Sequence, residues 1–324
     1  MKAKDLKYYV HRFTNLRRDN KYGGAPHKPI LLLSIINNIE SELILKNRIY
    51  ITPELIGTFK SIWADLVNSE RHHCLFSLPY FHMKSEPFWH LIPNLGFENI
   101  VKTNIKIRGL SNLKSAINYA EIDFELFLIL SNPVEREVLK LSILRKYFPD
   151  FIPTSSSNNG YINKIKSEII NEPSDIYRLK LFELEKELNA DEFEEEKYLR
   201  SHLFKQQVSL SYNNTCAISG LKIDTTSNAS LIDGCHIIPF SQSYDDTIVN
   251  GISLSPTLHR AFDRGLISIN ESYKVQVSKS FSESGDSNYS IKQFHNKEII
   301  LPNNLKHHPK VENLLWHQQN IYIQ

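Results

Sequence analysis

The stretch from Leu231 to Asn270 constrains the fold of this chain most strongly. It holds His236, Asn250 and His259, with thirteen residues between the first pair and eight between the second. The residues around these three predict a strand, a loop, a second strand and a short helix. That order would place His236 at the end of the first strand, Asn250 where the loop returns, and His259 on the helix that faces the strand.

Local signals mark the ends of these elements. Residues 230–238 predict a short strand, and the polar, turn-rich SQSYDDT that follows is typical of a connection between strands. The residues ISLS predict the second strand. A helix over residues 256–263 is predicted from an N-cap serine, a proline at the first helical position and a glycine after the last turn. The residues that carry these signals are Pro239, Gly251, Ser255, Pro256 and Gly265.

The two histidines suit two different chemical roles. An imidazole fixed by a strand can accept a proton from water, and a second imidazole on a facing helix can hold a divalent cation against a phosphate. Phosphodiester cleavage needs both roles. The alternative is a pair of core histidines and an asparagine in a turn. That alternative would be favoured for a single histidine, but the whole pattern favours a nuclease site.

Four short motifs in this region closely resemble the HNH endonucleases, in the branch with H-I-x-P, N-G and H-x-x-F-D-R-G. The motifs are C-x-x-S-G at 216–220, C-H-I-I-P at 235–239, N-G at 250–251 and L-H-R-A-F-D-R-G at 258–265. The resemblance covers roughly residues 195–272 and implies the ββα-metal fold. It also implies His236 as the general base, Asn250 as the residue that orients the loop or the base, and His259 as a metal ligand.

The resemblance further implies a divalent metal ion, with Mg²⁺ or Mn²⁺ expected and other transition metals as alternatives. Many relatives place an acidic residue directly before the first histidine as a second metal ligand, but this chain has Cys235 there. Asp233 and Asp263 are therefore the candidates for a second ligand beside His259. The cysteine also leaves open a different class of protein, a DNA-binding module with an inactive HNH fold.

Length and composition fit an ordinary globular protein with two cores. The chain has 324 residues, 41% of them hydrophobic and 23% charged. The longest apolar run is far shorter than the roughly 20 residues that span a bilayer, and the N-terminus lacks the apolar core of a signal peptide. Three widely separated cysteines, Cys74, Cys216 and Cys235, fit a reducing compartment. We therefore expect a cytoplasmic protein without a membrane partner.

The first 150 residues carry an excess of positive charge, with 21 Lys and Arg against 15 Asp and Glu. This excess could contact DNA phosphates or form only a solvated surface. A helix is predicted to begin near Pro29. His27 and Lys28 would then lie at its N-terminus, where unpaired N–H groups and the helix dipole favour an anion. The alternative is a loop followed by a core helix.

A second resemblance covers approximately residues 5–150. The motifs A-P-H-K-P-I-L-L-L, S-L-P-Y-F-H-M with E-P-F-W-H-L, and S-N-P-x-x-R-E-x-L with K-Y-F-P look like the sulfur-binding domain of phosphorothioate-dependent restriction endonucleases. The resemblance implies a shallow apolar pocket that accepts a backbone sulfur. The candidate residues for the pocket and the flanking phosphates are Leu78, Pro79, Tyr80, His82, His27, Lys28, His72 and His73.

The chemistry of such a pocket follows from the sulfur atom. Sulfur is larger, more polarisable and a poorer hydrogen-bond acceptor than oxygen, so apolar walls would prefer it; burying an unpartnered oxygen there costs on the order of a few kcal/mol. Relatives usually begin this stretch with Tyr-Pro, whereas this chain has Leu78-Pro79. The alternative for these crowded aromatic residues is the core of a hairpin.

The remaining segments suggest connectors. The stretch FIPTSSSNNG at 151–160 predicts a linker, and the acidic run DEFEEEK predicts a solvated helical face or the start of a helix. A following helix would offer Arg200 and Lys205 to DNA near the nuclease. Residues 273–324 show no active-site pattern.

The sequence predicts a mostly helical α+β protein, and the two resemblances imply a sulfur-binding DNA reader at 1–150, a linker and helical connector at 151–190, and an HNH endonuclease domain at 191–324. The expected activity is metal-dependent restriction of phosphorothioate-modified double-stranded DNA. An HNH nuclease of the homing or repair kind, which reads unmodified or otherwise modified DNA, is the alternative. A second copy of the chain, in a homodimer, is a further candidate partner.

Overall fold

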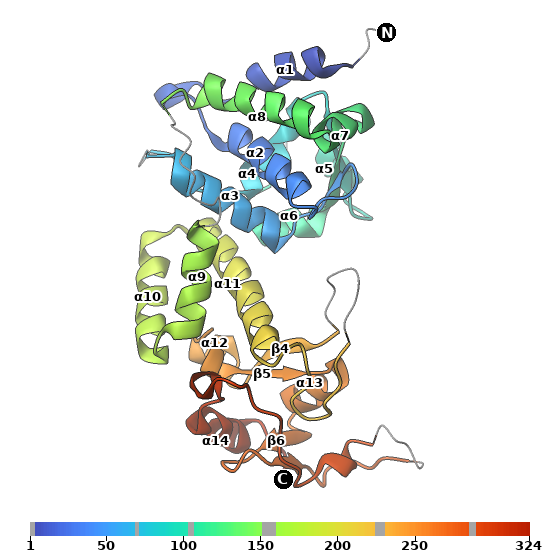
Figure 1. Cartoon of the computed structure of the whole chain (residues 1–324), viewed down its shortest axis with the longest axis vertical. Helices are drawn as coiled ribbons and strands as arrows, with labels where there is room; N and C mark the ends of the chain where they lie inside the picture. The colour runs from blue at the N-terminus through green and yellow to red at the C-terminus, as the bar shows by residue number, and fades with distance from the viewer. Residues whose placement is uncertain (1–3, 69–70, 103–106, 151–159, 224–230, 285–289) are drawn as a thin grey trace. The chain divides into compact units, whose positions relative to one another are not determined.

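The computed structural model of the chain describes residues 4–68, 71–102, 107–150, 160–223, 231–284 and 290–324. It is a mostly helical α+β protein with small antiparallel sheets, as predicted. Packing divides it into two compact units (Figure 1). Unit 1 comprises Met1–Asn163 and Glu185–Leu199, and unit 2 comprises Lys164–Leu184 and Arg200–Gln324.

Unit 1 packs helices around a three-stranded antiparallel sheet of order β1-β3-β2. A continuous apolar core lies between its long helices. Helix α2 is at the centre of this core, and most of its residues are buried. The elements are α1 (Leu6–Thr14), α2 (His27–Glu40), β1 (Arg48–Ile49), α3 (Pro53–Leu66), α4 (Ser77–His82), β2 (Trp89–Pro93), α5 (Glu98–Lys102), α6 (Leu110–Ala116), β3 (Ile117–Ile122), α7 (Phe124–Ser131) and α8 (Pro133–Tyr147).

Local signals start the two longest of the helices that surround α2. Thr52 caps α3 by accepting a hydrogen bond from the N–H of Leu55, and a proline follows it at the first helical position. Asn132 caps α8 in the same way, with its side-chain oxygen 3.0 Å from the N–H of Val134. Both starts therefore combine a polar cap with a proline whose missing N–H costs nothing there.

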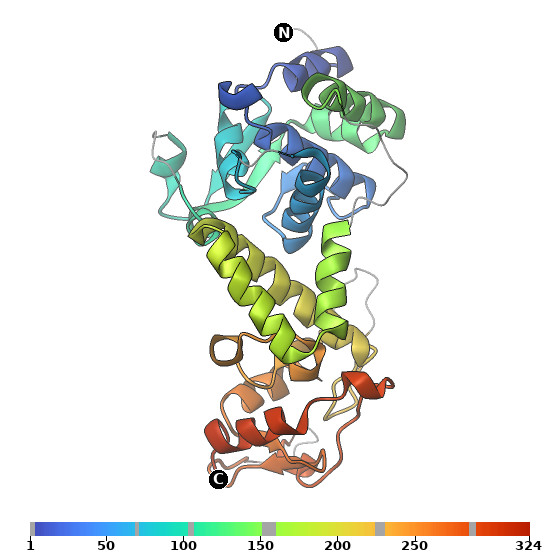
Figure 2. The same ribbon diagram turned by 90° about the vertical axis from the view of Figure 1, so that its left-hand side faces the viewer.

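Unit 2 contains two short hairpins, β4–β5 and β6–β7, with helices packed around them. Helices α9, α10 and α11 lie side by side in both views (Figures 1 and 2). The elements are α9 (Gly160–Asn171), α10 (Ser174–Glu187), α11 (Ala190–Ser211), β4 (Asp233–His236), α12 (Phe240–Ser243), β5 (Gly251–Leu254), α13 (Pro256–Asp263), β6 (Ile267–Ile269), β7 (Val275–Val277) and α14 (Val311–Asn320). Helices α9, α10 and α11 each contribute residues to both units.

The acidic run at the start of α11 is not the solvated face that the sequence suggested. The buried carboxylate of Glu195 accepts hydrogen bonds from two backbone N–H groups at the start of α4, both over 2.9 Å. Glu194 does the same at the start of α6. Glu196 is fully buried and lies 3.3 Å from the ammonium group of Lys60. The run does start a helix, but its carboxylates cap other helices and pair with a buried lysine.

The segment expected to connect the domains is divided between the two units. Residues 151–159 of the predicted linker lie outside the described residues. The helical part from Lys164 to Leu184 packs with the C-terminal unit, and Glu185 to Leu199 packs with the N-terminal one. In the part of the chain that the structure describes, we find no helix with the length and apolar character to cross a membrane.

Candidate active site

Helix α11 packs so closely on the β4–β5 hairpin that two positions must be glycine. A Cβ atom on Gly234 would lie 2.3 Å from the backbone oxygen of Lys205, and one on Gly251 would lie 2.3 Å from a methyl group of Val208. Both glycines face α11. The glycine of the N-G motif therefore serves this contact, which positions the strand ends that carry the candidate residues.

Helix α13 begins and ends where the sequence predicted. It spans Pro256–Asp263, with Ser255 at the N-cap and the proline at the first helical position. Gly265 follows in a left-handed conformation with φ of 68°, and a Cβ atom there would lie 2.0 Å from the carbonyl oxygen of Ile321. The glycine thus ends the helix and allows the chain after α14 to pack against it.

His236 is the last residue of β4 and is held on two sides. Its Nε2 lies 2.7 Å from Oδ1 of Asp246, which is 1% exposed. Its ring stacks on the buried ring of Phe204 from α11, with centroids 3.9 Å apart and planes at 12°. Because an ionised carboxylate only accepts hydrogen bonds, Nε2 carries the proton and donates it to Asp246. The lone pair of His236 is then on Nδ1, where it can accept a proton.

Asn250 is fully buried and ties the loop after β4 to the start of β5. Its side-chain oxygen accepts the N–H of Ile238 over 3.0 Å, and its Nδ2 donates to the carbonyl oxygens of Ile238 and Asp245, over 3.0 and 2.9 Å. The amide therefore fixes both ends of the loop that carries Asp246. Its contacts suit the loop-orienting role that the resemblance implied.

His259 lies on α13 between two carboxylates. Its Nδ1 is 3.0 Å from Oδ2 of Asp233 on β4, and its Nε2 is 3.3 Å from Oδ2 of Asp263 one helical turn later. The side chains of His259 and Asp233 are partly exposed, and that of Asp263 is exposed. The structure therefore brings together the three residues that the sequence nominated as metal ligands.

One imidazole and two carboxylates are ligands that suit Mg²⁺, Mn²⁺ and related divalent ions. Asp233, His259 and Asp263 fit such an ion by donor type and by proximity. As they lie, the carboxylates bind the ring nitrogens of His259, and within the described residues no three His, Cys, Asp or Glu side chains form a group arranged for a metal. A bound ion would have to replace the hydrogen bond between His259 and Asp233 or the contact between His259 and Asp263.

Cys235, at the position where many relatives have an acid, points into the interior. It is 1% exposed, and burial raises the pKa of its thiol well above the ordinary value. A protonated, buried thiol is a poor ligand for a hard divalent cation. Asp233 occupies the same face of the strand two residues earlier, and its side chain is 44% exposed.

The candidate base His236 and the candidate metal ligand Asp233 point to opposite faces of the β4–β5 hairpin. Side chains alternate along a strand, so His236 points to α11 while Asp233 points to α13. Sequence reasoning placed His259 on a helix that packs on the strand, which the structure confirms. It did not anticipate that the base would be held by α11.

Two functional partners of His236 were missed from the sequence. Asp246 lies in the turn-rich loop ten residues after the histidine, and the consecutive Asp245 and Asp246 in SQSYDDT could have been noted as a source of a carboxylate. Phe204 lies in the last third of α11, far before His236 in the sequence, and no local signal pairs them.

Arg200 does not offer its charge to DNA in this structure. It is 5% exposed, and its guanidinium donates to the carboxylate of Glu168 over 2.9 Å. The expectation of a DNA contact treated the helix as exposed on that side, whereas α9 and α10 cover it. Lys205, five residues later, is exposed.

In unit 1, the residues nominated at the start of α2 are engaged within the protein. Lys28 is 7% exposed, and its ammonium contacts Glu86 over 2.5 Å and Ser85 over 2.7 Å. His27 donates from Nε2 to the carbonyl oxygen of His73 over 2.8 Å, and burial lowers its pKa to about 4. A neutral imidazole and a paired lysine are not the phosphate-binding cations that the sequence suggested.

The stretch proposed as a sulfur pocket forms the short helix α4, and it is not a hairpin. Tyr80 is fully buried, with its hydroxyl donating to the carbonyl oxygen of Ile49 over 2.6 Å, and Pro79 is buried as well. Neither can line a surface pocket as it stands. Leu78 is partly exposed and His82 is exposed. His27 and His72 are also partly exposed, although Nε2 of His72 is buried, and His73 is exposed. A ligand could therefore reach part of the side chain of these five nominated residues.

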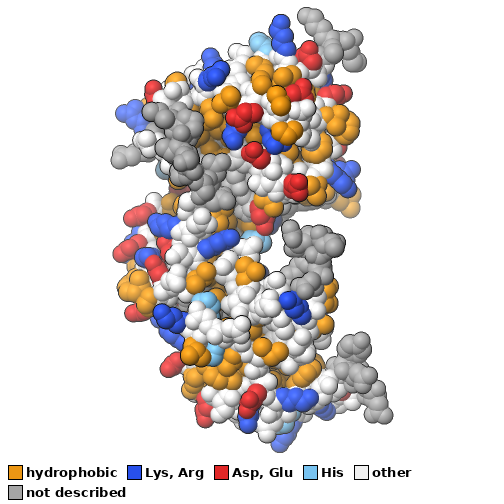
Figure 3. Space-filling model, in the orientation of Figure 1, with side chains coloured by type: hydrophobic (Ala, Val, Ile, Leu, Met, Phe, Trp, Pro, Cys, Tyr) orange, Lys and Arg blue, Asp and Glu red, His pale blue; other side chains and the backbone are white. Residues whose placement is uncertain are grey.

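On the face shown in Figure 3, basic and acidic side chains are interspersed over unit 1.

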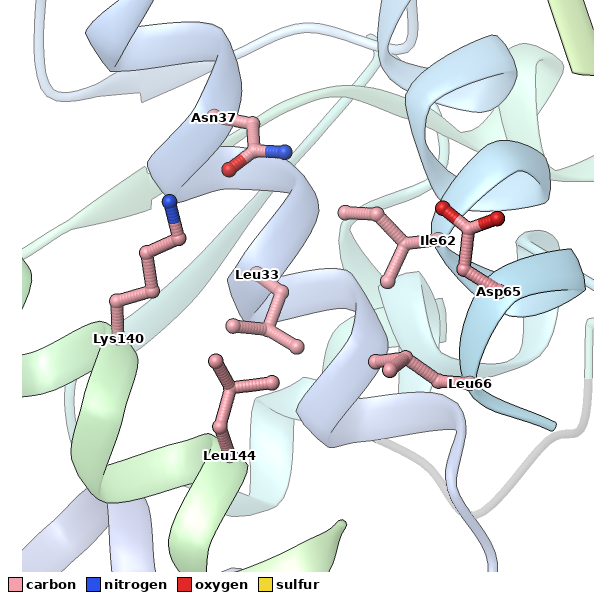
Figure 4. A pocket seen from close by; sticks show the side chains of 7 residues that line it. All are labelled: Leu33, Asn37, Ile62, Asp65, Leu66, Lys140 and Leu144. Atoms are coloured by element: carbon pink, nitrogen blue, oxygen red, sulfur yellow. The ribbon is translucent and has the colours of Figure 1, made fainter. Parts of the chain in front are cut away.

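Unit 1 contains a small pocket of about 50 Å³ between α2, α3 and α8 (Figure 4). Its lining is mainly apolar, with three polar residues among the seven: Leu33, Asn37, Ile62, Asp65, Leu66, Lys140 and Leu144.

Residues 216–270 match the HNH endonuclease family, so the chain contains an HNH endonuclease domain. Members of this family hydrolyse phosphodiester bonds. A solved structure described as a modification dependent TagI restriction endonuclease is similar at 21% identity, over 37% of this chain and 39% of that one, with a TM-score of 0.27. This chain therefore spans about two fifths of that structure. No curated protein matches the chain.

Proposed function

We propose that the chain is a metal-dependent DNA endonuclease whose general base is His236. The observation that carries the proposal is the 2.7 Å contact between Nε2 of His236 and the buried Asp246, which leaves Nδ1 to take a proton from water. The water oxygen then attacks phosphorus and the bond to the leaving oxygen breaks. Phe204 holds the imidazole plane, so the ring needs little reorganisation during proton transfer.

Asp233, His259 and Asp263 would hold the divalent ion. The ion, when bound, supplies a positive charge that stabilises the negative charge developing on the phosphate oxygens. His259 occupies the centre of the set because both of its ring nitrogens contact a carboxylate. Asn250 fixes the loop that carries Asp246, and so acts on the base through the backbone.

We further propose that unit 1 reads modified double-stranded DNA, with a phosphorothioate as the modification. The sequence motifs support this reading, and Leu78, His72, His73 and His82 remain accessible for it. Tyr80 and Lys28 would act only by shaping the fold around them. Lys205 would contact DNA next to the nuclease site. A second copy of the chain could supply the cut on the opposite strand.

Nicking of supercoiled plasmid with Mg²⁺ or Mn²⁺ tests the nuclease assignment. Since general-base catalysis contributes on the order of a hundredfold or more, His236→Ala should lose at least that much nicking rate while it keeps DNA affinity. His295→Ala, which removes an exposed histidine of the same unit, should nick at the wild-type rate. Wild-type nicking by His236→Ala, or no nicking by the wild type with either metal, would refute the proposed mechanism.

A further inference from the structure

A buried chain of polar groups leads from His236 away from the site. Asp246 uses one carboxylate oxygen for the histidine and places the other 3.4 Å from the hydroxyl oxygen of Tyr177 on α10. Tyr177 is 1% exposed. The carboxylate is therefore shared between the candidate base and a residue outside the segment that matches the HNH family.

The hydrogen-bond donors and acceptors among these polar groups can be assigned in one way only. The guanidinium of Arg200 donates to the hydroxyl oxygen of Tyr177 over 3.3 Å and to the carboxylate of Glu168 over 2.9 Å. A guanidinium cannot accept and a carboxylate cannot donate, so the hydroxyl hydrogen of Tyr177 must go to Asp246. Burial and the neighbouring carboxylate of Asp246 raise the pKa of Tyr177, which keeps that hydrogen in place.

The first turn of α10 contacts the same loop at a second point. The hydroxyl groups of Ser174 and Thr247 lie 3.1 Å apart, and both residues are buried. Lys310 donates to the Ser174 hydroxyl over 3.3 Å. Helix α10 therefore contacts two consecutive residues of the loop, Asp246 through its carboxylate and Thr247 through its hydroxyl.

We propose that Tyr177, held by Arg200 and Glu168, is a positioning residue for the catalytic base. It keeps the carboxylate of Asp246 at the place and angle that fix the His236 ring with Nδ1 free. The inference rests on the proposed role of His236. It extends the working nuclease unit back to helices α9 and α10, which the sequence assigned to a connector.

Tyr177→Phe tests this role because it removes one hydroxyl and keeps the ring. Tyr212→Phe is the matched control, since Tyr212 is also buried in unit 2 and its hydroxyl has no hydrogen-bond partner in the described part of the chain. We expect Tyr177→Phe to lower kcat for nicking about tenfold, a fraction of what general-base catalysis contributes, with unchanged affinity for DNA. Tyr212→Phe should keep both values.

A second readout follows the ring directly. Nitrogen-15 NMR of histidine-labelled protein, with the His236 signals assigned through a His236→Gln variant, reports which ring nitrogen carries the proton. Wild type and Tyr212→Phe should show the Nε2–H form, and Tyr177→Phe should show a larger fraction of the other tautomer. A purely structural role for Tyr177 would leave this ratio unchanged.

The outcomes separate the two proposals. If His236→Ala nicks like the wild type, the proposed function fails. If His236→Ala is inactive but Tyr177→Phe matches Tyr212→Phe in kcat and in tautomer ratio, the positioning role alone is overturned. A Tyr177→Phe variant that loses thermal stability without a change in tautomer ratio also overturns it.

Discussion

The ammonium group of Lys28 lies 2.5 Å from Oε1 of Glu86 in the interior of unit 1. Burial lowers the pKa of Lys28, and the carboxylate opposes that shift. The two residues are 58 positions apart in sequence, so their pairing is part of the tertiary fold. Substitutions at Lys28 are therefore expected to change the stability of unit 1 before they change its affinity for DNA.

We expect Lys28→Ala to destabilise unit 1 by about 3 kcal/mol, because it leaves the buried carboxylate of Glu86 without a cation, with only the N–H of Arg17 and the hydroxyl of Ser85 as donors. Urea unfolding measures the change. The double substitution Lys28→Met with Glu86→Leu removes both charges and should recover part of the stability, because the N–H of Arg17 also loses its acceptor. If Lys28→Ala keeps wild-type stability and only lowers DNA affinity, the buried pair has no structural role.

Gly234→Ala should weaken the packing of α11 on the β4–β5 hairpin by about 3 kcal/mol. The added methyl group would meet the backbone oxygen of Lys205 at 2.3 Å, and backbone cannot move aside as a side chain can. Gly160→Ala is the control, since a Cβ atom there has nothing within 4 Å. Thermal unfolding compares the two, and equal melting temperatures would contradict the close approach.

Metal binding should raise the melting temperature of the wild type, because a ligand that binds only the folded state stabilises it. His259→Ala and Asp263→Asn should reduce the rise produced by Mn²⁺, and Glu271→Gln, at an exposed position of the same unit, should not. A full Mn²⁺ response in His259→Ala would exclude it as a ligand.

Unit 2 should lose stability in mild acid through His317, whose stacked ring donates to the carbonyl oxygen of Phe262. Burial lowers its pKa from 6.5 to about 4. Between these values the unfolded chain binds a proton and the folded chain does not, so the free energy of unfolding falls by about 1.4 kcal/mol per pH unit as pH decreases. Above pH 6.5 His317 adds nothing to the pH dependence of the free energy of unfolding.

Urea unfolding at several pH values tests the role of His317. His317→Gln should be less stable near neutral pH but should show a flatter pH dependence, while the exposed His11→Gln keeps the wild-type slope. An identical slope in His317→Gln and wild type would rule out the histidine as the source.

Phosphorothioate recognition should depend on the accessible side of α4. Leu78→Ser should reduce the preference for a phosphorothioate duplex over an unmodified one. A pocket wall that can hydrogen-bond to a phosphate oxygen no longer favours sulfur over oxygen. Leu128→Ser, at an exposed apolar position of α7, serves as the control. Fluorescence anisotropy with the two duplexes measures the ratio. Equal wild-type affinity for both duplexes would refute the sulfur hypothesis.

Sequence reasoning succeeded where the signals are local. The bounds of α13 follow from Ser255, Pro256 and Gly265, which act on the backbone within a few residues. The partners of the candidate base could not be predicted in the same way. Phe204 and Tyr177 approach His236 and Asp246 only after α10 and α11 have packed on the hairpin.

The errors in unit 1 have the same physical origin. A lysine and a tyrosine beside a motif suggest a surface, but the side chains of α2 and α4 turn inward to Glu86 and to the backbone of Ile49. Burial of polar groups is decided by partners that are distant in sequence, and no local pattern reports them.

The carboxylates at the start of α11 limit how the chain can be divided into smaller fragments that fold. A recombinant reader that stops near Asp150 would lack Glu194, Glu195 and Glu196, so the first turns of α4 and α6 and the ammonium group of Lys60 would lose their partners. Supplying residues 185–199 as a separate peptide should restore the fold of such a fragment. A chimera that joins this nuclease to another reader would need a redesigned first half of α11.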